Sequence, residues 1–367
     1  MRHQSRLPQI MSFAMCVALL WLMACGKKEM PIPLSVQDIS ALIKLSTKND
    51  SESDFWAREI HSSLERLKLD VSKSNVCAVI SIIEQESSFN PDPVVPGITS
   101  ILKKRLDKAT SKLVIGQLIK IRLGMRASNN QTFRRNINSI RTERDLERWF
   151  QEFILEEWGG DSVLQIVGQD IDHLISTLGS MQVSIFYARE YAEKKDIEKE
   201  NLREYLYSRE GGVFFGTAHL LDYKAEYPDL IYRFADYNAG QYASRNAGFQ
   251  EMLARLSGRQ LSLDGDLLIY RSGSINSSKS YEAACATLAK QLDKDQILDD
   301  FKHGKEESFI ETSTYKTICQ LYSSKYNNVV KARIPDIQLQ SDKLSKNRTT
   351  EWYANTVTTR FKQCMAR

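Results

Sequence analysis

Apolar residues recur three and four positions apart along almost the whole chain from residue 36 onward, and this spacing constrains the fold most. Such spacing places apolar side chains on one face of an α-helix. Glycine and proline, which mark turns, number only 17 and 8 among 367 residues, too few for a many-turned β-sandwich or barrel. The sequence therefore predicts an all-α protein, with helices near 36–46, 52–69, 74–88, 98–107, 111–123, 143–158, 183–194, 198–208, 213–225, 229–236, 241–256, 278–293, 308–325 and 349–363.

Two local features refine this helical pattern. Ser74 stands where the helix near 74–88 should begin and is the predicted N-cap. Residues 259–277 lack the helical spacing, so we expect a β or loop interruption there, close to a domain boundary.

The first 24 residues have the pattern of a signal peptide rather than of a folded segment. Arg2 and Arg6 precede an apolar stretch, residues 10–24, that is too short to span a bilayer comfortably. The stretch runs into Leu22-Met23-Ala24-Cys25, which resembles the lipobox of bacterial lipoproteins. This resemblance implies that Cys25 is lipidated after cleavage. An ordinary secretory cleavage and an uncleaved anchor helix are the alternatives.

The expected membrane contact is the lipid on Cys25. Gly26 is not acidic, which by resemblance to lipoprotein sorting rules favours the outer membrane, with the protein facing the periplasm. Residues 25–34 contain two prolines and predict an extended tether. No later segment approaches the ~20 apolar residues that a spanning helix needs. A formal net charge of +4 is too small to indicate a nucleic-acid partner.

Four cysteines remain after the signal peptide and the anchor, in a compartment where disulfides persist. Cys77 lies in a strongly apolar run and is interpreted as a buried free thiol. One bridge among Cys285, Cys319 and Cys364 is then the expectation. None of the four has the CxxC spacing of a metal or redox site.

Missing motifs exclude several kinds of catalytic site. The chain has no glycine-rich phosphate loop, no GxSxG nucleophile motif and no HExxH metal motif. Its five histidines are scattered singly, and each is expected to be a surface or packed residue. We therefore expect neither a metal nor another cofactor.

The most informative segment, residues 74–97, places a glutamate on an apolar helix face. At about 100° per residue, Glu86 falls between Val79 and Ile82, whereas Glu84 falls at the edge of the polar side. Burial disfavours a carboxylate and raises the pKa above the ~4.3 of a free glutamate. Glu86 would then stay protonated and could act as a general acid near neutral pH. A buried glutamate paired with Arg or Lys for structure fits this helix equally well.

Two short stretches further along the chain complete a set of three motifs. Gly179-Ser180-Met181-Gln182-Val183 opens one predicted helix, and Tyr237-Asn238-Ala239-Gly240 lies where another should end. In this order, Glu-Ser-x-Phe, Gly-x-Met-Gln and Tyr-Asn-Ala-Gly resemble the three motifs of the lysozyme-like lytic transglycosylases, the SLT domain. Residues 209–221 also look like the helix that precedes the third motif in that family. The resemblance covers about residues 70–256.

This resemblance implies both a fold and an activity. The fold would be the helical domain of goose-type lysozyme and the SLT domain. The activity would be cleavage of the β-1,4 bond between MurNAc and GlcNAc in peptidoglycan glycan strands, with formation of 1,6-anhydroMurNAc. Glu86 would be the sole catalytic acid and base. The resemblance gives substrate-binding roles to Ser87, Met181, Gln182, Tyr237 and Asn238.

The spacing of the motifs departs from the family. Glu86 and Gly179 lie 93 positions apart, whereas typical members have a few tens, so the resemblance implies a helical insertion at about 99–170. The expected organisation is a signal peptide (1–24), a tether (25–34), a lysozyme-like catalytic domain containing the insertion (35–258) and a helical C-terminal extension of unknown role (259–367).

Two other functions stay open at this point. Asp236 replaces the usual alanine before Tyr237 and is a second acid, so a lysozyme-type muramidase that uses water is one alternative. A non-catalytic peptidoglycan-binding lipoprotein is the other. The intact Glu86, with Gln182, Tyr237 and Asn238, favours the enzyme, because a protein that only binds need not retain the acid.

Overall fold

The computed structural model of the chain describes residues 32–46, 52–111, 115–154, 175–271, 274–339 and 348–367. The expected signal peptide, Cys25 and residues 26–31 of the tether lie outside the described residues, as do residues 155–170 of the expected insertion. Residues 34–367 form one unit, to which the following description applies. Within the described ranges, no helix has the length and apolar character to cross a membrane.

Helices dominate the described residues, which confirms the all-α prediction. They are α2 (Val36–Ser46), α3 (Ser53–Arg66), α4 (Lys73–Glu86), α5 (Ile98–Thr110), α6 (Ile115–Gly124), α7 (Phe133–Asn136), α8 (Glu143–Ile154), α10 (Ile185–Lys194), α11 (Leu202–Leu206), α12 (Arg209–Leu221), α13 (Ile231–Ala239), α14 (Ala243–Ser257), α15 (Lys279–Thr287), α16 (Lys294–Lys302), α17 (Ser313–Tyr326) and α18 (Thr350–Met365).

Strands in the described ranges form short antiparallel hairpins. They are β1 (Thr177–Leu178) with β2 (Val183–Ser184), β3 (Ile269–Arg271) with β4 (Ser274–Asn276), and β5 (Gln338–Leu339) with β6 (Arg348–Thr349). The β3–β4 hairpin lies within 259–277, the stretch where the sequence predicted an interruption.

Some helices begin or end at other residues than predicted, because a different polar side chain caps the helix. Ser72, not Ser74, is the N-cap of α4: its extended backbone lets its Oγ accept a hydrogen bond from Asn75 N at 3.3 Å. The segment expected as one helix over 278–293 ends at Thr287, and a new helix, α16, begins after the capping residue Asp293.

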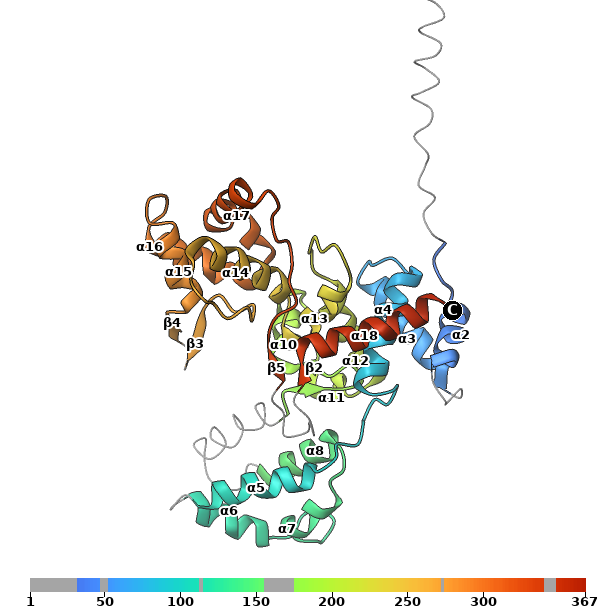
Figure 1. The fold of residues 1–367 in the computed structure, drawn as a ribbon. Helices are drawn as coiled ribbons and strands as arrows, with labels where there is room; N and C mark the ends of the chain where they lie inside the picture. Colours follow the sequence, from blue (N-terminus) through green and yellow to red (C-terminus); the bar gives the residue numbers. More distant parts are fainter. Residues whose placement is uncertain (1–31, 47–51, 112–114, 155–174, 272–273, 340–347) are drawn as a thin grey trace, which may run out of the picture. The chain divides into compact units, whose positions relative to one another are not determined.

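The larger of two hydrophobic cores joins helices from both ends of the chain. Its buried side chains come from α2, α3 and α4, from α12 and α13, and from α18 at the C-terminus. In Figure 1, α18, drawn in red, lies along α4 and α13, and these helices are in contact. Ala354 and Val357 of α18 are fully buried in this core. The last helix is thus packed with the helices that carry Glu86 and Tyr237.

A second, smaller core lies among α14, α15, α16 and α17. Phe249 of α14 packs edge-on against Phe301 and Phe309, with ring centroids 5.9 and 5.3 Å apart. After α17 the chain returns past α14, where Arg333 N donates to Ser244 O at 2.9 Å. Residues 259–367 are therefore divided between the two cores rather than forming one extension.

Helices α5 to α8 occupy the described part of the expected insertion. An aromatic cluster holds them together: Trp149 stacks on Phe153 with centroids 4.8 Å apart, and Phe133 meets the Phe153 ring edge-on at 5.3 Å. A buried ion pair joins Glu147 of α8 to Arg203 of α11, with Nε–Oε1 at 2.6 Å. The subdomain is thus fastened to the rest of the unit through α8.

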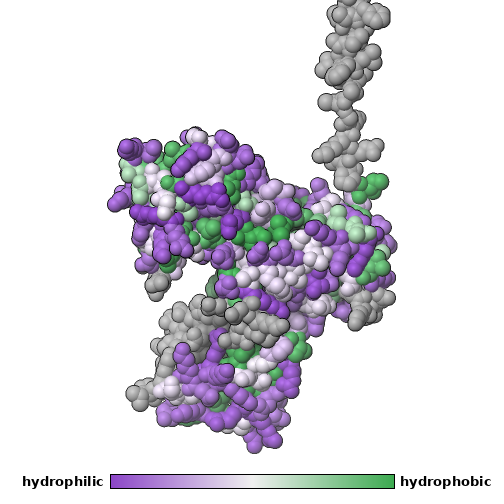
Figure 2. Space-filling view, in the orientation of Figure 1, coloured by the Kyte–Doolittle hydropathy of each residue, from purple (hydrophilic) through white to green (hydrophobic). Residues whose placement is uncertain are grey.

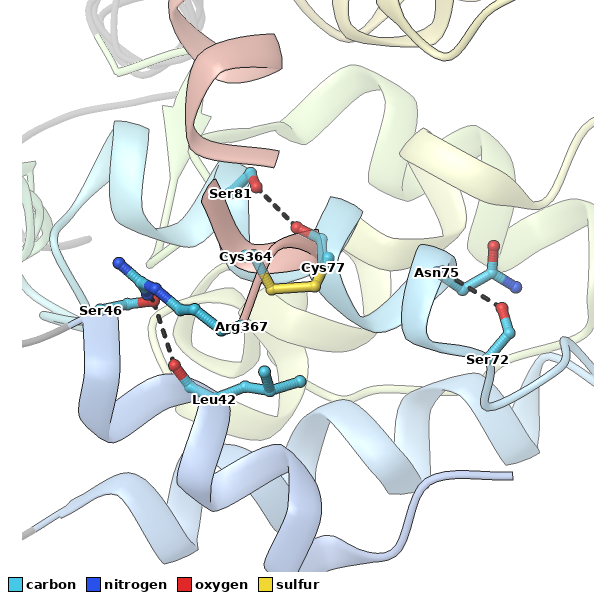
Figure 3. Close-up of a disulfide and its surroundings, with 8 residues drawn as sticks. All are labelled: Leu42, Ser46, Ser72, Asn75, Cys77, Ser81, Cys364 and Arg367. Carbon is cyan, nitrogen blue, oxygen red and sulfur yellow. Dashed lines mark hydrogen bonds between the residues drawn. A yellow bond between two sulfur atoms is a disulfide. The ribbon is translucent and has the colours of Figure 1, made fainter. Parts of the chain in front are cut away.

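A disulfide joins α4 to the last turn of α18 (Figure 3). Cys77 and Cys364 are bonded, with Cα atoms 5.6 Å apart and a sequence separation of 287. The interpretation of Cys77 as a free thiol is therefore wrong, and so is a bridge among the other three cysteines, because Cys285 and Cys319 are free. The apolar run around Cys77 indicated its burial but not that the helix covering it carries Cys364.

Candidate active site

Glu86 is the last residue of α4 and is enclosed by protein at its carboxyl. Ile82 and Ile83, just before it, are fully buried, whereas Glu86 itself keeps some exposure to solvent. Burial raises the pKa of Glu86 from 4.5 to about 7, against the opposing effect of a hydrogen bond from Tyr353. Near neutral pH the carboxyl is therefore present in both protonation states, in line with the expectation from its place on the helix.

The hydrogen-bond partner of Glu86 comes from the other end of the chain. Tyr353, in the first turn of α18, donates its hydroxyl hydrogen to Glu86 Oε1. Burial and the charge of Glu86 raise the pKa of Tyr353 well above its ordinary value, so the phenol remains a donor. Among the described residues, no lysine or arginine forms an ion pair with Glu86. The partner of Glu86 is thus a neutral phenol, and not the Arg or Lys that a purely structural glutamate would pair with.

The neighbouring Glu84 has a different partner. The Arg360 guanidinium of α18 forms an ion pair with Glu84 and also donates from Nε to Gln85 Oε1 at 3.2 Å. The two acids of Glu-Gln-Glu are therefore not equivalent, as their positions on the helix indicated. Glu84 forms an ion pair that holds α18 against α4, whereas the partner of Glu86 is the uncharged Tyr353.

Tyr237 lies beside Glu86 in the last turn of α13. Its hydroxyl donates to Met181 O at 2.7 Å. Burial, followed by the charges of Glu86 and Tyr187, raises the pKa of Tyr237 well above its ordinary value. Glu86 and Tyr237 both contribute to the raised pKa of Tyr353. The carboxyl and the two phenols therefore form one cluster.

Two glycines let the second motif approach this cluster. Met181 is fully buried, and a Cβ on Gly216 of α12 would lie 2.4 Å from Met181 Sδ. Gly179 has φ +73°, and a Cβ there would lie 2.0 Å from Leu206 O. Glycine at 216 thus leaves room for the Met181 side chain, and glycine at 179 leaves room for the Leu206 carbonyl. Both contacts help to position Met181, whose carbonyl accepts from Tyr237.

Gln182 is turned toward the insertion. Its amide nitrogen donates to Glu143 Oε2 of α8 at 3.3 Å, and its amide oxygen accepts from Thr177 Oγ1 at 3.0 Å. These hydrogen bonds hold the side chain on the β1–β2 hairpin. The structure therefore brings Met181 to the tyrosine cluster but connects Gln182 to α8.

Ser87 and Asn238 have local partners. Ser87, the C-cap of α4, is buried and donates from Oγ to Ile83 O at 3.2 Å. Asn238 is exposed, and its Oδ1 accepts from Thr350 Oγ1 of α18 at 2.9 Å. Asn238 thus helps to hold the first turn of α18, the same turn that carries Tyr353.

Asp236 is buried at the corner between α13 and α14. It accepts hydrogen bonds from the hydroxyls of Tyr223 and Tyr227, at 3.0 and 2.6 Å, and from the backbone nitrogens of Tyr242 and Ser244, at 3.0 and 2.6 Å. Burial raises the pKa of Asp236 above its ordinary value. Both of its oxygens are thus engaged in holding this corner.

His219 packs against the rings of Tyr237 and Tyr187. Its ring centroid lies 4.9 Å from that of Tyr237 and 4.4 Å from that of Tyr187. Burial lowers the pKa of His219 to about 4, so the ring is neutral, and Nε2 donates to Tyr237 O at 3.2 Å. It is a packed histidine, as expected, and supports the backbone of the tyrosine.

The arrangement suits proton transfer. Across the described ranges, no group of His, Cys, Asp and Glu side chains is arranged to hold a metal ion. The cluster offers one carboxyl that titrates near neutral pH and two phenols that remain donors. A single group of this kind can both give and accept a proton.

Sequence reasoning missed Tyr353 and Thr350, the residues by which α18 meets Glu86 and Asn238. Nothing in the local pattern distinguishes this tyrosine from others in the chain. The available signal was the amphipathic segment 349–363, which must pack its apolar face on some other helix. The pattern did not indicate which helix.

Comparison with known proteins places the chain in a family. Residues 49–367 match a family described as "Protein of unknown function (DUF1615)", and the chain belongs to that family. It is 33% identical over 359 residues to the uncharacterized protein YaiW of Escherichia coli (strain K12). That alignment covers 95% of this chain and 96% of YaiW. No solved structure matches the chain.

Proposed function

We propose that this protein is a peptidoglycan lytic transglycosylase with a lysozyme-like catalytic domain. The observation that carries the proposal is the Glu86 carboxyl, enclosed at the end of α4, with a pKa raised to about 7 and a phenol as its partner. The meeting of the three motifs also supports the proposal. Glu86, Met181 and Tyr237 come from distant parts of the sequence and lie in one cluster.

In the proposed reaction Glu86 acts twice. The protonated carboxyl gives its proton to the glycosidic oxygen between MurNAc and GlcNAc, and the bond from MurNAc C1 to that oxygen breaks. The resulting carboxylate takes the proton of the MurNAc C6 hydroxyl, whose oxygen bonds to C1. The product is 1,6-anhydroMurNAc, no water is consumed, and Glu86 is again protonated. A pKa near 7 suits both steps, because the two protonation states are close in free energy.

One carboxyl is sufficient for this reaction. Hydrolytic glycosidases use two carboxyls, about 5 to 9.5 Å apart, one as acid and the other as nucleophile or base for water. In a transglycosylase the substrate supplies its own hydroxyl, held next to the reacting carbon. Asp236 is the second acid of the motif region, and the hydrogen bonds that it accepts from two phenols and two backbone nitrogens favour a structural role over activation of water.

The substrate residues keep the roles that the motif resemblance implies. Tyr237 and Met181 belong to the cluster at Glu86, where the Tyr237 hydroxyl donates to Met181 O and Tyr353 is the direct partner of the carboxyl. Gln182, Ser87 and Asn238 contribute from the hairpin, the end of α4 and the end of α13. Lipidation at Cys25 would keep the protein at the outer membrane, facing the peptidoglycan in the periplasm.

The test is mass spectrometry of fragments released from purified sacculi by the protein without residues 1–25. Wild-type protein should release products lighter than hydrolysis products by one water, and Glu86→Gln should release none. Glu65→Gln is the matched control, because its side chain is 63% exposed on α3 and makes an i,i+4 contact with His61. It should act like the wild type.

The alternatives give different products. Reducing ends of full mass would identify a lysozyme-type muramidase and overturn the transglycosylase. Binding of sacculi without release, by wild type and Glu86→Gln alike, would identify a non-catalytic peptidoglycan-binding lipoprotein.

A further inference from the structure

The subdomain α5–α8 concentrates positive charge. Residues 98–154 contain 13 Lys and Arg against 5 Asp and Glu, a net charge of +8, whereas the whole chain carries +4. The remainder of the chain is therefore net negative. A charge this localised, on helices outside the candidate active site, indicates an anionic partner.

The positive charge is on the surface and is not neutralised locally. Six exposed basic residues come from α5 and α7: Lys103, Lys104, Arg105, Lys108, Arg134 and Arg135. Within the described residues, none of these six side chains forms an ion pair.

The acids of the subdomain are mostly engaged elsewhere. Glu143 and Glu147 are buried, and Glu147 is paired with Arg203. Asp145 accepts from Arg141 N at 2.9 Å, and Glu152 accepts from Ser128 N. Asp107 is the one exposed acid in the described part of the subdomain. The basic side chains therefore face solvent with little compensation.

Large aliphatic side chains are also exposed in this subdomain, on α6. Leu118 and Ile121 of α6 are 37% and 53% exposed, and their i,i+3 spacing puts them on one side of the helix next to Lys120. Figure 2 shows the same combination over this subdomain, a mainly hydrophilic surface with smaller hydrophobic patches. No described residue buries either side chain.

We propose that the exposed face of α5, α6 and α7 binds the surface of an anionic phospholipid membrane. Lys and Arg side chains attract phosphate headgroups, and guanidinium groups such as those of Arg134 and Arg135 bind phosphate oxygens in pairs. Leu118 and Ile121 enter the boundary between headgroups and acyl chains. A hydrated polycarboxylate would match the charge but would leave these two side chains in water, so the lipid surface is favoured.

Vesicle co-sedimentation tests this proposal. The protein beginning at Gly26 carries no acyl group, and residues 34–367 form a unit of their own, so every contact described above is retained. Binding to phosphatidylcholine vesicles with added phosphatidylglycerol should be strong at low salt and fall as salt rises. Binding to pure phosphatidylcholine should be at background. Absence of binding at low salt, or equal binding to both vesicles, would overturn the proposal.

Charge reversal locates the surface. Lys104→Glu, Lys108→Glu, Arg134→Glu and Arg135→Glu combined should weaken binding by about a hundredfold or more. The matched control reverses four exposed basic residues of the second core region, Arg259, Lys279, Lys290 and Lys294, and should retain nearly all binding. An equal loss in the control would show that overall charge, not this face, determines binding, against the proposal.

The aliphatic pair separates lipid from polymer. Leu118→Ser with Ile121→Ser should weaken vesicle binding severalfold but leave binding to soluble poly-glutamate unchanged. Both side chains are exposed, so folding should be retained, and circular dichroism verifies it. The lipid proposal fails if the double variant loses binding to vesicles and to poly-glutamate equally. It also fails if poly-glutamate displaces the vesicles when its total charge only equals theirs. Either result would show that the surface recognises an anionic polymer. Glu86→Gln should bind vesicles like the wild type, so this result is independent of the proposed activity.

Discussion

Tyr353 donates a hydrogen bond to Glu86 across a sequence separation of 267 residues. Two opposing effects on the pKa of Glu86 therefore meet at one carboxyl: burial raises it and the phenol lowers it, leaving it at about 7. The phenol is supplied by α18, which the disulfide, the Arg360–Glu84 ion pair and the Thr350–Asn238 hydrogen bond hold in place. The acidity of Glu86 thus depends on where the last helix lies.

Tyr353→Phe should shift the pH dependence of glycan release to higher pH. The phenol stabilises the carboxylate, and a hydrogen bond to a charged group contributes about 1.5–3 kcal/mol, or about one to two pKa units. Without it the pKa of Glu86 rises, and the alkaline limb of the activity profile moves up by about one unit. Muropeptide release measured across neutral pH checks this. Tyr322→Phe, a buried tyrosine of the second core, should leave the profile in place.

Glu86→Gln should stabilise the protein at alkaline pH. The folded pKa of Glu86, about 7, lies above the ordinary value of 4.5, so folding favours the protonated form, and wild-type stability falls as the pH rises from 4.5 through 7. A neutral amide avoids this loss and still accepts from Tyr353. The expected gain in free energy of unfolding is about 2–3 kcal/mol above pH 7.

Urea denaturation at acid and alkaline pH measures this difference. The gain should vanish at acid pH, where the wild-type carboxyl is protonated in both states. Glu65→Gln, whose side chain is largely exposed, should show no gain at either pH. A stability difference independent of pH would mean that the Glu86 carboxyl is not buried as described.

Cys364→Ser should destabilise the protein by about 2–5 kcal/mol, because the disulfide to Cys77 closes a very long loop of the unfolded chain. Denaturation without reductant measures the loss. Replacing the free Cys285 and Cys319 together is the control and should change stability much less. Peptide mapping of non-reduced protein that linked Cys77 or Cys364 to Cys285 or Cys319 would contradict the assigned pairing.

Gly216→Ala should destabilise the protein by about 1–3 kcal/mol and reduce glycan release, since the new methyl group would displace Met181 and the carbonyl that accepts from Tyr237. Gly124→Ala is matched chemically and has nothing within 4 Å of the added Cβ. Thermal unfolding and muropeptide assays of both variants give the comparison, and equal behaviour would refute the tight contact.

Local pattern predicted the helices well because an amphipathic face is a property of consecutive residues. It also predicted that Glu86 differs from Glu84, since burial at one helix position follows from its neighbours. It could not predict Tyr353 or the Cys77–Cys364 bridge, because both depend on which helix covers α4. Gln182 illustrates the same limit: the motif resemblance implied a substrate-binding role, and it could not indicate that the side chain makes hydrogen bonds with Glu143, Thr177 and Gly179 O.

The position of α18 after all three motifs also determines when the candidate site is complete. A polypeptide is made from its N-terminus, and Glu86, Met181 and Tyr237 all precede α18. A nascent chain that has not reached Thr350 contains all three motifs but lacks both Tyr353 and the cysteine that fixes this helix. Loss of α18, by a premature stop codon or by proteolysis, would therefore leave all three motifs in place and still remove Tyr353, the partner of Glu86.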